Sequence, residues 1–173
     1  MSSRFLPTVI ITSMLSVKDL RAPSVLWLTV GGSGFLRPAP GTWGSLAGLG
    51  LWWLLLKGLS PLHQLLVVTV YSGVSWFLCE RLVEQRRIKD EPQIVADEVA
   101  GLWLALVFIP SSGPWPWLAL GLFRFFDIVK PGPIGWLDRN VHSGLGIMLD
   151  DLAAGLLTGL TLALAALILA WGL

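Results

Sequence analysis

The sequence predicts an all-helical bundle embedded in a membrane. Its mean hydropathy is +0.73 and only 13% of its 173 residues are charged, which is far from the composition of a soluble domain. A bilayer core about 30 Å thick needs roughly 20 apolar residues per helix. Windows of that size without Asp, Glu, Lys or Arg occur at residues 38–56, 58–79, 99–123 and 152–173. Many of the ten tryptophans stand near the ends of these windows, as in an interfacial aromatic belt.

Composition narrows the class of protein further. The net charge of +1 argues against nucleic acid binding, which requires a concentrated basic face. Cys79 is the single cysteine, so it cannot form an internal disulfide, and we expect it to be a small core residue. We expect no signal peptide in residues 1–24, which lack a clean apolar stretch followed by a small-residue cleavage site. Residues 1–29 are predicted to form an N-terminal arm and residues 30–173 a single helical domain.

The first charge-free window overlaps a stretch rich in glycine and proline. Residues 30–45 read VGGSGFLRPAPGTWGS, which predicts a shaped loop. Its glycines would let backbone N–H groups approach an anion, and Thr42 or Ser45 would cap a following helix whose positive end favours phosphate. A plain turn that enters the membrane is the alternative. Apolar helices are then predicted at residues 46–56 and 62–79.

Residues 80–98 are the most charged part of the chain. The positive-inside rule places this segment, together with the basic N-terminal side, in the cytoplasm. The next window is interrupted by Pro110, Pro114 and Pro116, so it forms either a kinked single span or a helical hairpin. We favour the hairpin, because it returns the charged ends of the window to one side of the membrane.

Residues 123–155 concentrate charged groups between two apolar runs. Arg124, Asp127 and Lys130 follow one another at intervals of three, which puts them roughly on one helical face. Ionisable groups near hydrocarbon are costly to desolvate, so such a group is more often functional than incidental. An ion pair of Arg124 with Asp127 that only makes burial tolerable is the alternative.

The end of this segment leads into the last apolar helix. We expect residues 134–147 to form a glycine-rich loop, in which His142 would be a loop residue rather than a catalytic base. Asp150 and Asp151 would stand at the start of a helix over residues 152–173, where carboxylates suit the helix dipole. Because adjacent helical residues point about 100° apart, the two aspartates would take different roles.

The acidic residues form an oxygen-rich set with almost no sulfur or imidazole. Oxygen ligands suit a hard cation, and magnesium commonly uses one or two carboxylates together with water and substrate phosphate. Basic residues nearby would hold that phosphate. The acidic set is Asp97, Glu98, Asp127, Asp138, Asp150 and Asp151, and the basic set is Arg124, Lys130 and Arg139. These groups and the glycine-rich loops indicate phosphoryl chemistry, whereas Asp138 and Arg139 taken alone are typical of solvated loop charges.

Several phosphatase mechanisms are excluded. Cys79 is followed at the sixth position by Gln85 and not by arginine, so a phosphocysteine mechanism lacks its phosphate loop. The chain has no Asp-x-Asp pair for an aspartyl-phosphate enzyme and no Pro-Ser-Gly-His segment of the histidine-type lipid phosphatases. Residues 30–45 lack the Gly-Lys-Ser/Thr of a P-loop. Metal-assisted attack by water remains the simplest route.

Three blocks of the chain resemble the phosphatidylglycerophosphatase A family. They read GSGFLRPAPGTWGS at residues 32–45, IVADEVAGLW at residues 94–103 and FRFFDIVKPGPIGWLDRNVHSGLGIMLDDLAAG at residues 123–155. The resemblance implies an all-helical bundle that removes the terminal phosphate of phosphatidylglycerophosphate with magnesium, yielding phosphatidylglycerol in the bacterial inner membrane. The chain departs from the usual pattern of the family at Arg37, Gly132, Gly135 and Ser143.

We therefore predict a multi-pass lipid phosphatase with a charged site at loops and helix ends on the cytoplasmic side. The predicted catalytic residues are Asp97, Glu98, Asp127 and Asp151. The predicted Mg²⁺ ligands come from Asp97, Glu98, Asp127, Asp150 and Asp151. The predicted substrate-binding residues are Arg124, Lys130, Arg139, Thr42 and Ser45. A noncatalytic membrane transport or scaffold subunit is one alternative, and a phosphatase for another phosphomonoester is the other.

Overall fold

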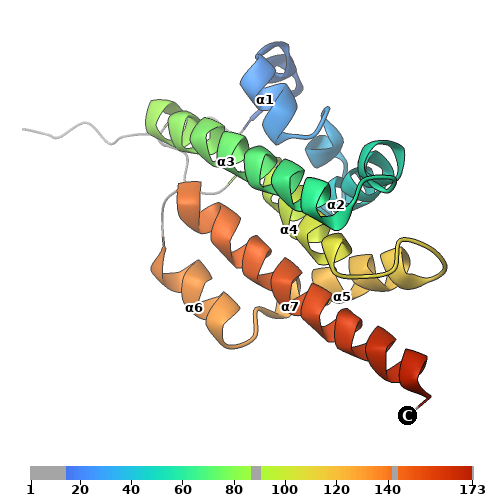
Figure 1. Ribbon diagram of the computed structural model, residues 1–173. Helices are drawn as coiled ribbons and strands as arrows, with labels where there is room; N and C mark the ends of the chain where they lie inside the picture. The colour runs from blue at the N-terminus through green and yellow to red at the C-terminus, as the bar shows by residue number, and fades with distance from the viewer. Residues whose placement is uncertain (1–14, 87–90, 142–143, 173) are drawn as a thin grey trace, which may run out of the picture.

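The computed structural model of the protein describes residues 15–86, 91–141 and 144–172. In these ranges the chain forms helices and turns without a strand, which confirms the all-helical prediction (Figure 1). The longer helices in chain order are α1 (Pro23–Leu28), α2 (Pro40–Leu51), α3 (Pro61–Arg86), α4 (Ala96–Val107), α5 (Trp115–Val129), α6 (Pro133–Asn140) and α7 (Gly144–Trp171). Shorter helical turns are η1 (Val17–Arg21), η2 (Ser33–Phe35) and η3 (Trp52–Leu56).

Helix α4 is the centre of the bundle. It packs against α2, α3, α5 and α7, and Figure 1 shows it between α3 and α7. Val99, Leu102 and Leu106 of α4 are fully buried and join the main core with Trp52 and Phe123. Burying each such side chain contributes about 1.5–3 kcal/mol. The burial of α4 therefore fixes where its polar first turn lies.

Glycines allow the closest approaches to α4. A Cβ atom at Gly155 of α7 would lie 2.0 Å from the carbonyl oxygen of Gly101 in α4. On another side, a Cβ atom at Gly44 of α2 would lie 2.5 Å from the Cβ of Val95, just before α4. The backbones of α2 and α7 can therefore approach α4 as closely as membrane helices do at small-residue contacts.

The proline-interrupted window forms a helical hairpin, as predicted. Helix α4 ends at Val107 and α5 begins at Trp115, so the prolines lie in and around the connecting turn. Glu98 at the start of α4 lies 3.7 Å from Arg124 near the end of α5. The charged ends of the window thus meet at one end of the bundle.

Two helices are long and apolar enough to cross a membrane, judged by length and composition. They are Pro61–Leu82 within α3 and Leu145–Trp171 within α7. Only 22% and 28% of their most apolar windows are buried inside the protein. Large side chains such as Leu66 and Leu164 are exposed on them. A lipid environment would cover these faces.

The predicted loop over residues 134–147 is wrong. Pro133 occupies the first turn of α6, where its fixed φ suits a helix and its missing N–H costs nothing. Helix α7 then begins at Gly144, well before the predicted start. Asp150 and Asp151 consequently lie inside α7 and not at its start.

The glycine-rich loop over residues 30–45 is also shorter than predicted. It contains η2, and α2 already begins at Pro40. The N-cap of α2 is Ala39, without a side-chain hydrogen bond, so the prediction that Thr42 or Ser45 caps this helix is wrong. Ser45 is inside the helix, and its hydroxyl donates a 2.8 Å hydrogen bond to the carbonyl of Gly41.

Part of the predicted N-terminal arm is folded against the bundle. Val25 and Leu28 of α1 are buried in a second apolar cluster with Cys79, which confirms the core role expected for that cysteine. The backbone N–H of Val95 donates a 2.9 Å hydrogen bond to the carbonyl of Leu28. The domain boundary after residue 29 stays a prediction.

Candidate active site

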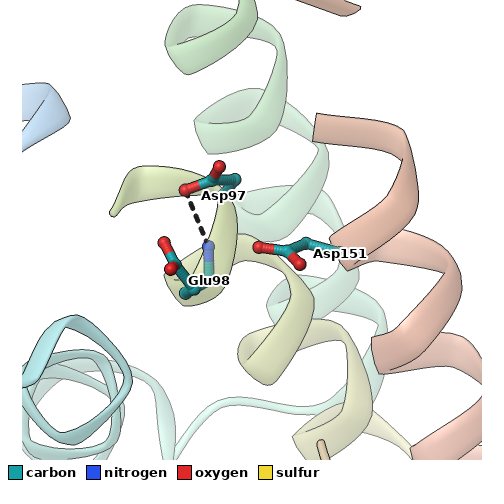
Figure 2. A group of neighbouring side chains, drawn as sticks. All are labelled: Asp97, Glu98 and Asp151. Atoms are coloured by element: carbon teal, nitrogen blue, oxygen red, sulfur yellow. Dashed lines mark hydrogen bonds between the residues drawn. The ribbon is translucent and has the colours of Figure 1, made fainter. Parts of the chain in front are cut away.

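Three carboxylates from two helices meet beside the start of α4. Asp97 and Glu98 lie in the first turn of α4 and Asp151 lies in α7. One oxygen from each carboxylate lies within 4.8 Å of the other two. Figure 2 shows Asp151 pointing from α7 toward the turn that carries the other two, where the Glu98 N–H donates a 3.1 Å hydrogen bond to Asp97 Oδ1. We call Asp97, Glu98 and Asp151 the acidic cluster.

The glycine contact between α4 and α7 brings the acidic cluster together. Gly101 lies one helical turn after Asp97, and Gly155 lies one turn after Asp151. Because the two glycines touch through their backbones, the preceding turns of α4 and α7 also lie side by side. A Cβ atom at Gly101 would lie 2.5 Å from the carbonyl oxygen of Asp151 itself.

Two members of the acidic cluster are buried and Glu98 is partly buried, which is unfavourable for three free carboxylates. Asp97 is 8% exposed and Asp151 4%. Burial and the charge of Glu98 raise the pKa of Asp97 well above its usual value. Burial raises the pKa of Glu98 to about 7. Buried carboxylates this close to one another require protons or a cation to relieve their repulsion.

Helix α5 adds a cation and a fourth carboxylate. Arg124 Nη1 lies 2.6 Å from Asp127 Oδ2 and 3.7 Å from Glu98 Oε1. Asp127 is within hydrogen-bonding range of Asp151. Arg124 and Asp127 thus share one face of α5, as their spacing predicts. The buried Nε of Arg124 has no hydrogen-bond partner within the described residues, so this guanidinium retains a donor for a ligand.

The first turn of α2 closes the site on another side. A Cβ atom at Gly41 would lie 2.2 Å from Glu98 Oε1 and 2.9 Å from Arg124 Nη2. Only glycine therefore fits here without moving both side chains. This helix end, with its free N–H groups and positive dipole, therefore lies beside the pair, which favours an anion there. Thr42 lies in the same turn and is partly buried.

Lys130 forms a separate polar group with two other aspartates. Its Nζ lies 2.5 Å from Asp138 Oδ1 and 2.7 Å from Asp150 Oδ2. Burial alone would lower the pKa of Lys130, but these hydrogen bonds outweigh it and raise the pKa above its usual value. Lys130 ends α5 in a left-handed conformation with φ of 47°, so the prediction that it shares a face with Arg124 is wrong.

The two adjacent aspartates of α7 therefore take different roles, as their helical geometry predicts. Asp151 joins the acidic cluster, whereas Asp150 binds Lys130. Asp150 still has one buried oxygen without a hydrogen-bond partner in the described part of the chain. It lies close enough to Asp97 for their charges to interact.

Other predicted residues lie away from the acidic cluster. Arg139 is exposed on α6, and its Nη1 would be 3.1 Å from a Cβ atom at Gly135. Arg37 is exposed before Pro38. His142 lies outside the described residues, so its predicted role stays a prediction.

The donor set fits a divalent cation. Every ligand in the acidic cluster is a carboxylate oxygen, and the Oε2 atom of Glu98 is buried without a hydrogen-bond partner among the described residues. Oxygen-only sets suit hard cations such as Mg²⁺. A bound cation would also remove the repulsion that burial imposes. Three of the predicted acidic residues that are distant in sequence thus lie together, and their role as metal ligands stays a prediction.

Sequence reasoning missed two of the glycines that build the site, Gly101 and Gly155, whereas Gly41 lies in the glycine-rich stretch that it singled out. Gly41, Gly101 and Gly155 make the close contacts, yet none carries a chemical group. The available signal was positional, since Gly101 follows Asp97 by four residues and Gly155 follows Asp151 by four. Four residues are about one turn, which places each glycine on the same helical face as its aspartate.

The fold and the site define a class of protein: a helical, membrane-compatible enzyme with buried carboxylates beside an arginine and a glycine-bearing helix end. The profile of the family described as phosphatidylglycerophosphatase A matches residues 26–166. The chain therefore belongs to the phosphatidylglycerophosphatase A family. The prediction of a phosphoric monoester hydrolase is confirmed, and the noncatalytic alternative receives no support.

Individual relatives agree with this assignment. Phosphatidylglycerophosphatase A of Escherichia coli K12 is 42% identical over 135 residues, covering 76% of this chain and 77% of the relative. The protein of the same name from Haemophilus influenzae is 42% identical over 132 residues, covering 75% and 80%. A putative phosphatidylinositol-3-phosphatase of Bacteroides thetaiotaomicron is 34% identical over 157 residues, covering 84% and 97%. No solved structure matches the chain significantly.

Proposed function

We propose that the protein hydrolyses the terminal phosphate of phosphatidylglycerophosphate, in a Mg²⁺-dependent reaction, to give phosphatidylglycerol. Two relatives that cover about three quarters of the chain carry the name of this activity. The acidic cluster is the observation that supports the metal dependence, because three carboxylates within 4.8 Å, two of them buried and one partly buried, need a cation to be charged together. Phosphate hydrolysis is a reaction that such a cation promotes.

The acidic cluster would hold the cation. Bound by Asp97, Glu98 and Asp151, Mg²⁺ would supply Lewis-acid polarisation of the phosphoryl group. Asp127 and Asp150 are further ligand candidates, because both interact electrostatically with members of the cluster. The glycine contact between α4 and α7 holds the carboxylates in place, so little reorganisation is needed when substrate binds.

The terminal phosphate would lie between the acidic cluster and the start of α2. Arg124 would bind it through the donors that its ion pairs leave free and would neutralise charge developing on the phosphoryl oxygens. The N–H groups of the first turn of α2 would add donors, and the Thr42 hydroxyl would be within this turn. Ser45 would act indirectly, by holding the first turn of α2 in place, because its hydroxyl already donates a hydrogen bond to the Gly41 carbonyl.

Asp127 is well placed to accept a proton from the attacking water. It sits between Arg124 and Asp151, so it touches both the phosphate-binding and the metal-binding parts of the site. The 2.6 Å ion pair with Arg124 would hold the Asp127 carboxylate in a fixed position for this role as a general base. Lys130 and Arg139 would bind outer oxygens of the head group, Lys130 from its position between Asp138 and Asp150.

The protein would be a multi-pass protein of the bacterial inner membrane with this site at the cytoplasmic side. Support comes from the two helices of membrane-spanning length and from the positive-inside rule, since the sequence after the first of them is rich in basic residues, Arg81, Arg86, Arg87 and Lys89. The acyl chains of the substrate would remain at the depth of the bilayer, in hydrophobic surroundings, while the phosphate reaches the start of α4.

A second substrate is favoured by one comparison. The Bacteroides relative that is matched over 97% of its length is named a putative phosphatidylinositol-3-phosphatase. A phosphatase for another membrane phosphomonoester is therefore the alternative, and it would use the same acidic cluster.

The test is phosphate release by the purified full chain in detergent. Phosphatidylglycerophosphate, phosphatidylinositol 3-phosphate and a soluble phosphomonoester would be compared, each with Mg²⁺, with EDTA, and with EDTA followed by excess Mg²⁺. We expect fastest release from phosphatidylglycerophosphate, loss with EDTA and recovery with Mg²⁺. Equal release in EDTA would contradict the metal dependence, and preference for another substrate would replace the proposed one.

A further inference from the structure

An open apolar groove of about 1080 Å³ lies on the side of the bundle. One wall is the exposed face of α3, including Leu66 and Val70, and the opposite wall is the end of α2 with η3, including Leu54. Helix α1 closes one end with Trp27. The groove is distinct from the acidic cluster, whose residues do not line it.

The lining of the groove offers hydrocarbon and almost no hydrogen bonds. The indole N–H of Trp27 is already donated to Ser75 Oγ at 2.9 Å, and that of Trp103 to the Gly48 carbonyl at 2.7 Å. The hydroxyl of Tyr71 is hydrogen-bonded with Ser75. A ligand with polar groups would lose hydrogen bonds on entering, whereas an acyl chain would lose none.

The groove is open to the surface that a bilayer would cover. Its α3 wall belongs to Pro61–Leu82, one of the two helices of membrane-spanning length. Leu66 and Val70 on this wall are 61% and 58% exposed. A lipid could therefore move into the groove sideways from the membrane without leaving a hydrophobic environment.

One lining residue of the groove, Trp103, belongs to the helix that carries the site. Trp103 lies on α4 five residues after Glu98, which is about 7.5 Å along the helix axis. Tyr71, another lining residue, packs against Trp103 with ring centroids 4.8 Å apart. Asp97 and Glu98 are near enough to act electrostatically on the Tyr71 hydroxyl. The groove is thus linked to the acidic cluster through α4 and through Tyr71.

We propose that this groove holds an acyl chain of the phospholipid substrate while the terminal phosphate of the same molecule lies at the acidic cluster. The inference rests on the proposed function and adds a chain-binding part to it. It predicts that the enzyme distinguishes a long acyl chain from a short one by binding and not only by its concentration in the membrane.

Gly50 gives a way to fill the groove without disturbing the fold. It lies in α2 and lines the groove, and a Cβ atom placed there would meet nothing within 4 Å. Gly50→Phe would therefore place a ring in the acyl-chain position. Gly73→Phe is the matched control, because Gly73 is also helical, exposed and free of neighbours but does not line the groove.

The test measures KM and kcat of the full chain in mixed micelles, with dipalmitoyl and with dibutyryl phosphatidylglycerophosphate. For Gly50→Phe we expect KM for the dipalmitoyl lipid to rise about tenfold or more, with the dibutyryl lipid hydrolysed as by wild type. Gly73→Phe should match wild type on both. Equal kinetics of both variants on the long-chain lipid would overturn the inference, as would an equal loss on both lipids in Gly50→Phe.

A second readout does not depend on turnover. Phosphatidylglycerol with a photoreactive diazirine at the end of one acyl chain would be irradiated with wild type and with each variant. We expect cross-links to Leu54 and Val70 in wild type and Gly73→Phe, and their loss in Gly50→Phe. Cross-links spread evenly over α3 and α7 would indicate bulk lipid and overturn the inference. If wild type released no phosphate in the first test, the proposed function would fail, whereas the cross-links would still decide the occupant of the groove.

Discussion

Gly101 of α4 and Gly155 of α7 touch so closely that a single added methyl group at Gly155 would lie 2.0 Å from the Gly101 carbonyl oxygen. Each glycine follows a carboxylate of the acidic cluster by one turn, Asp97 in α4 and Asp151 in α7. The contact sets the distance between the two helices and hence the distance between the carboxylates. The packing of α4 against α7 at these two glycines therefore determines the geometry of the acidic cluster.

A larger residue at this crossing should move the carboxylates of α4 away from Asp151 of α7. We expect Gly155→Ala to lower stability by about 1–3 kcal/mol and to reduce activity more than stability explains, because α4 and α7 must move apart. Thermal unfolding in detergent and phosphate release would be measured on the same sample. The control is Gly121→Ala, a helical position where a Cβ atom meets nothing within 4 Å. Wild-type activity in Gly155→Ala would contradict the role of the contact.

Removing a charge from the acidic cluster should lower activity without lowering the stability of the metal-free protein. Asp97→Asn and Asp151→Asn should each lower phosphate release by about 10²-fold or more, in line with the loss of one preorganised electrostatic group. In EDTA both variants should be at least as stable as wild type, because buried carboxylate repulsion is reduced.

Asp138→Asn is the comparison, since this more exposed carboxylate lies outside the acidic cluster. It should retain far more activity than the two cluster variants. Near-normal hydrolysis by both cluster variants would remove the metal hypothesis.

Stability without metal should fall as pH rises. The folded pKa of Glu98 is raised by burial from 4.5 to about 7, so the folded state binds more protons than the unfolded state in that window. The sign follows from this excess: stability decreases between about pH 4.5 and 7 and levels off above. Asp97, whose pKa is also raised by burial, acts in the same direction.

Mg²⁺ should reverse this trend, because its ligands must be deprotonated. The increase in Tm on adding Mg²⁺ should therefore grow from pH 5.5 to pH 8. Thermal scans at a series of pH values, with EDTA or with Mg²⁺, provide the measurement. An increase in Tm with Mg²⁺ that does not change with pH would be inconsistent with binding at Glu98.

Arg124 should not be replaceable by lysine. Its guanidinium reaches Asp127 and Glu98 together and keeps an unused buried donor, a geometry that an ammonium group cannot reproduce. Arg124→Lys should lower kcat by about 10²-fold while the protein remains folded. Kinetics of Arg124→Lys would be compared with those of Arg139→Lys, at an exposed position of α6. Similar small losses in both would argue against a role of Arg124 at the reacting phosphate.

The sequence was sufficient to predict the all-helical fold and the hairpin, and it named the three carboxylates that the structure brings together. The hairpin followed from Pro110, Pro114 and Pro116, because prolines in an apolar window interrupt a helix whatever surrounds it. Carboxylates in an apolar chain are conspicuous for a similar local reason, the cost of burying them.

Two features of the site region depend on tertiary contacts and could not be predicted from the sequence: the direction of Lys130 and the helix that begins at Pro133. The spacing of the residues predicts that Lys130 shares a helical face with Arg124. The left-handed conformation at the end of α5 instead directs Lys130 toward Asp138 and Asp150. The segment after Pro133 contains several glycines and was predicted as a loop, yet packing on α7 supports a helix there. Local composition gives no information about such partners.

Mn²⁺ binding followed by electron paramagnetic resonance, on the same samples used for phosphate release, tests the central claim most directly. Wild type and Asp138→Asn should bind Mn²⁺ in competition with Mg²⁺ and hydrolyse phosphatidylglycerophosphate. Asp97→Asn and Asp151→Asn should lose tight Mn²⁺ binding and hydrolysis together. Unchanged Mn²⁺ binding in Asp97→Asn and Asp151→Asn would contradict the assignment of the metal to the crossing of α4 and α7.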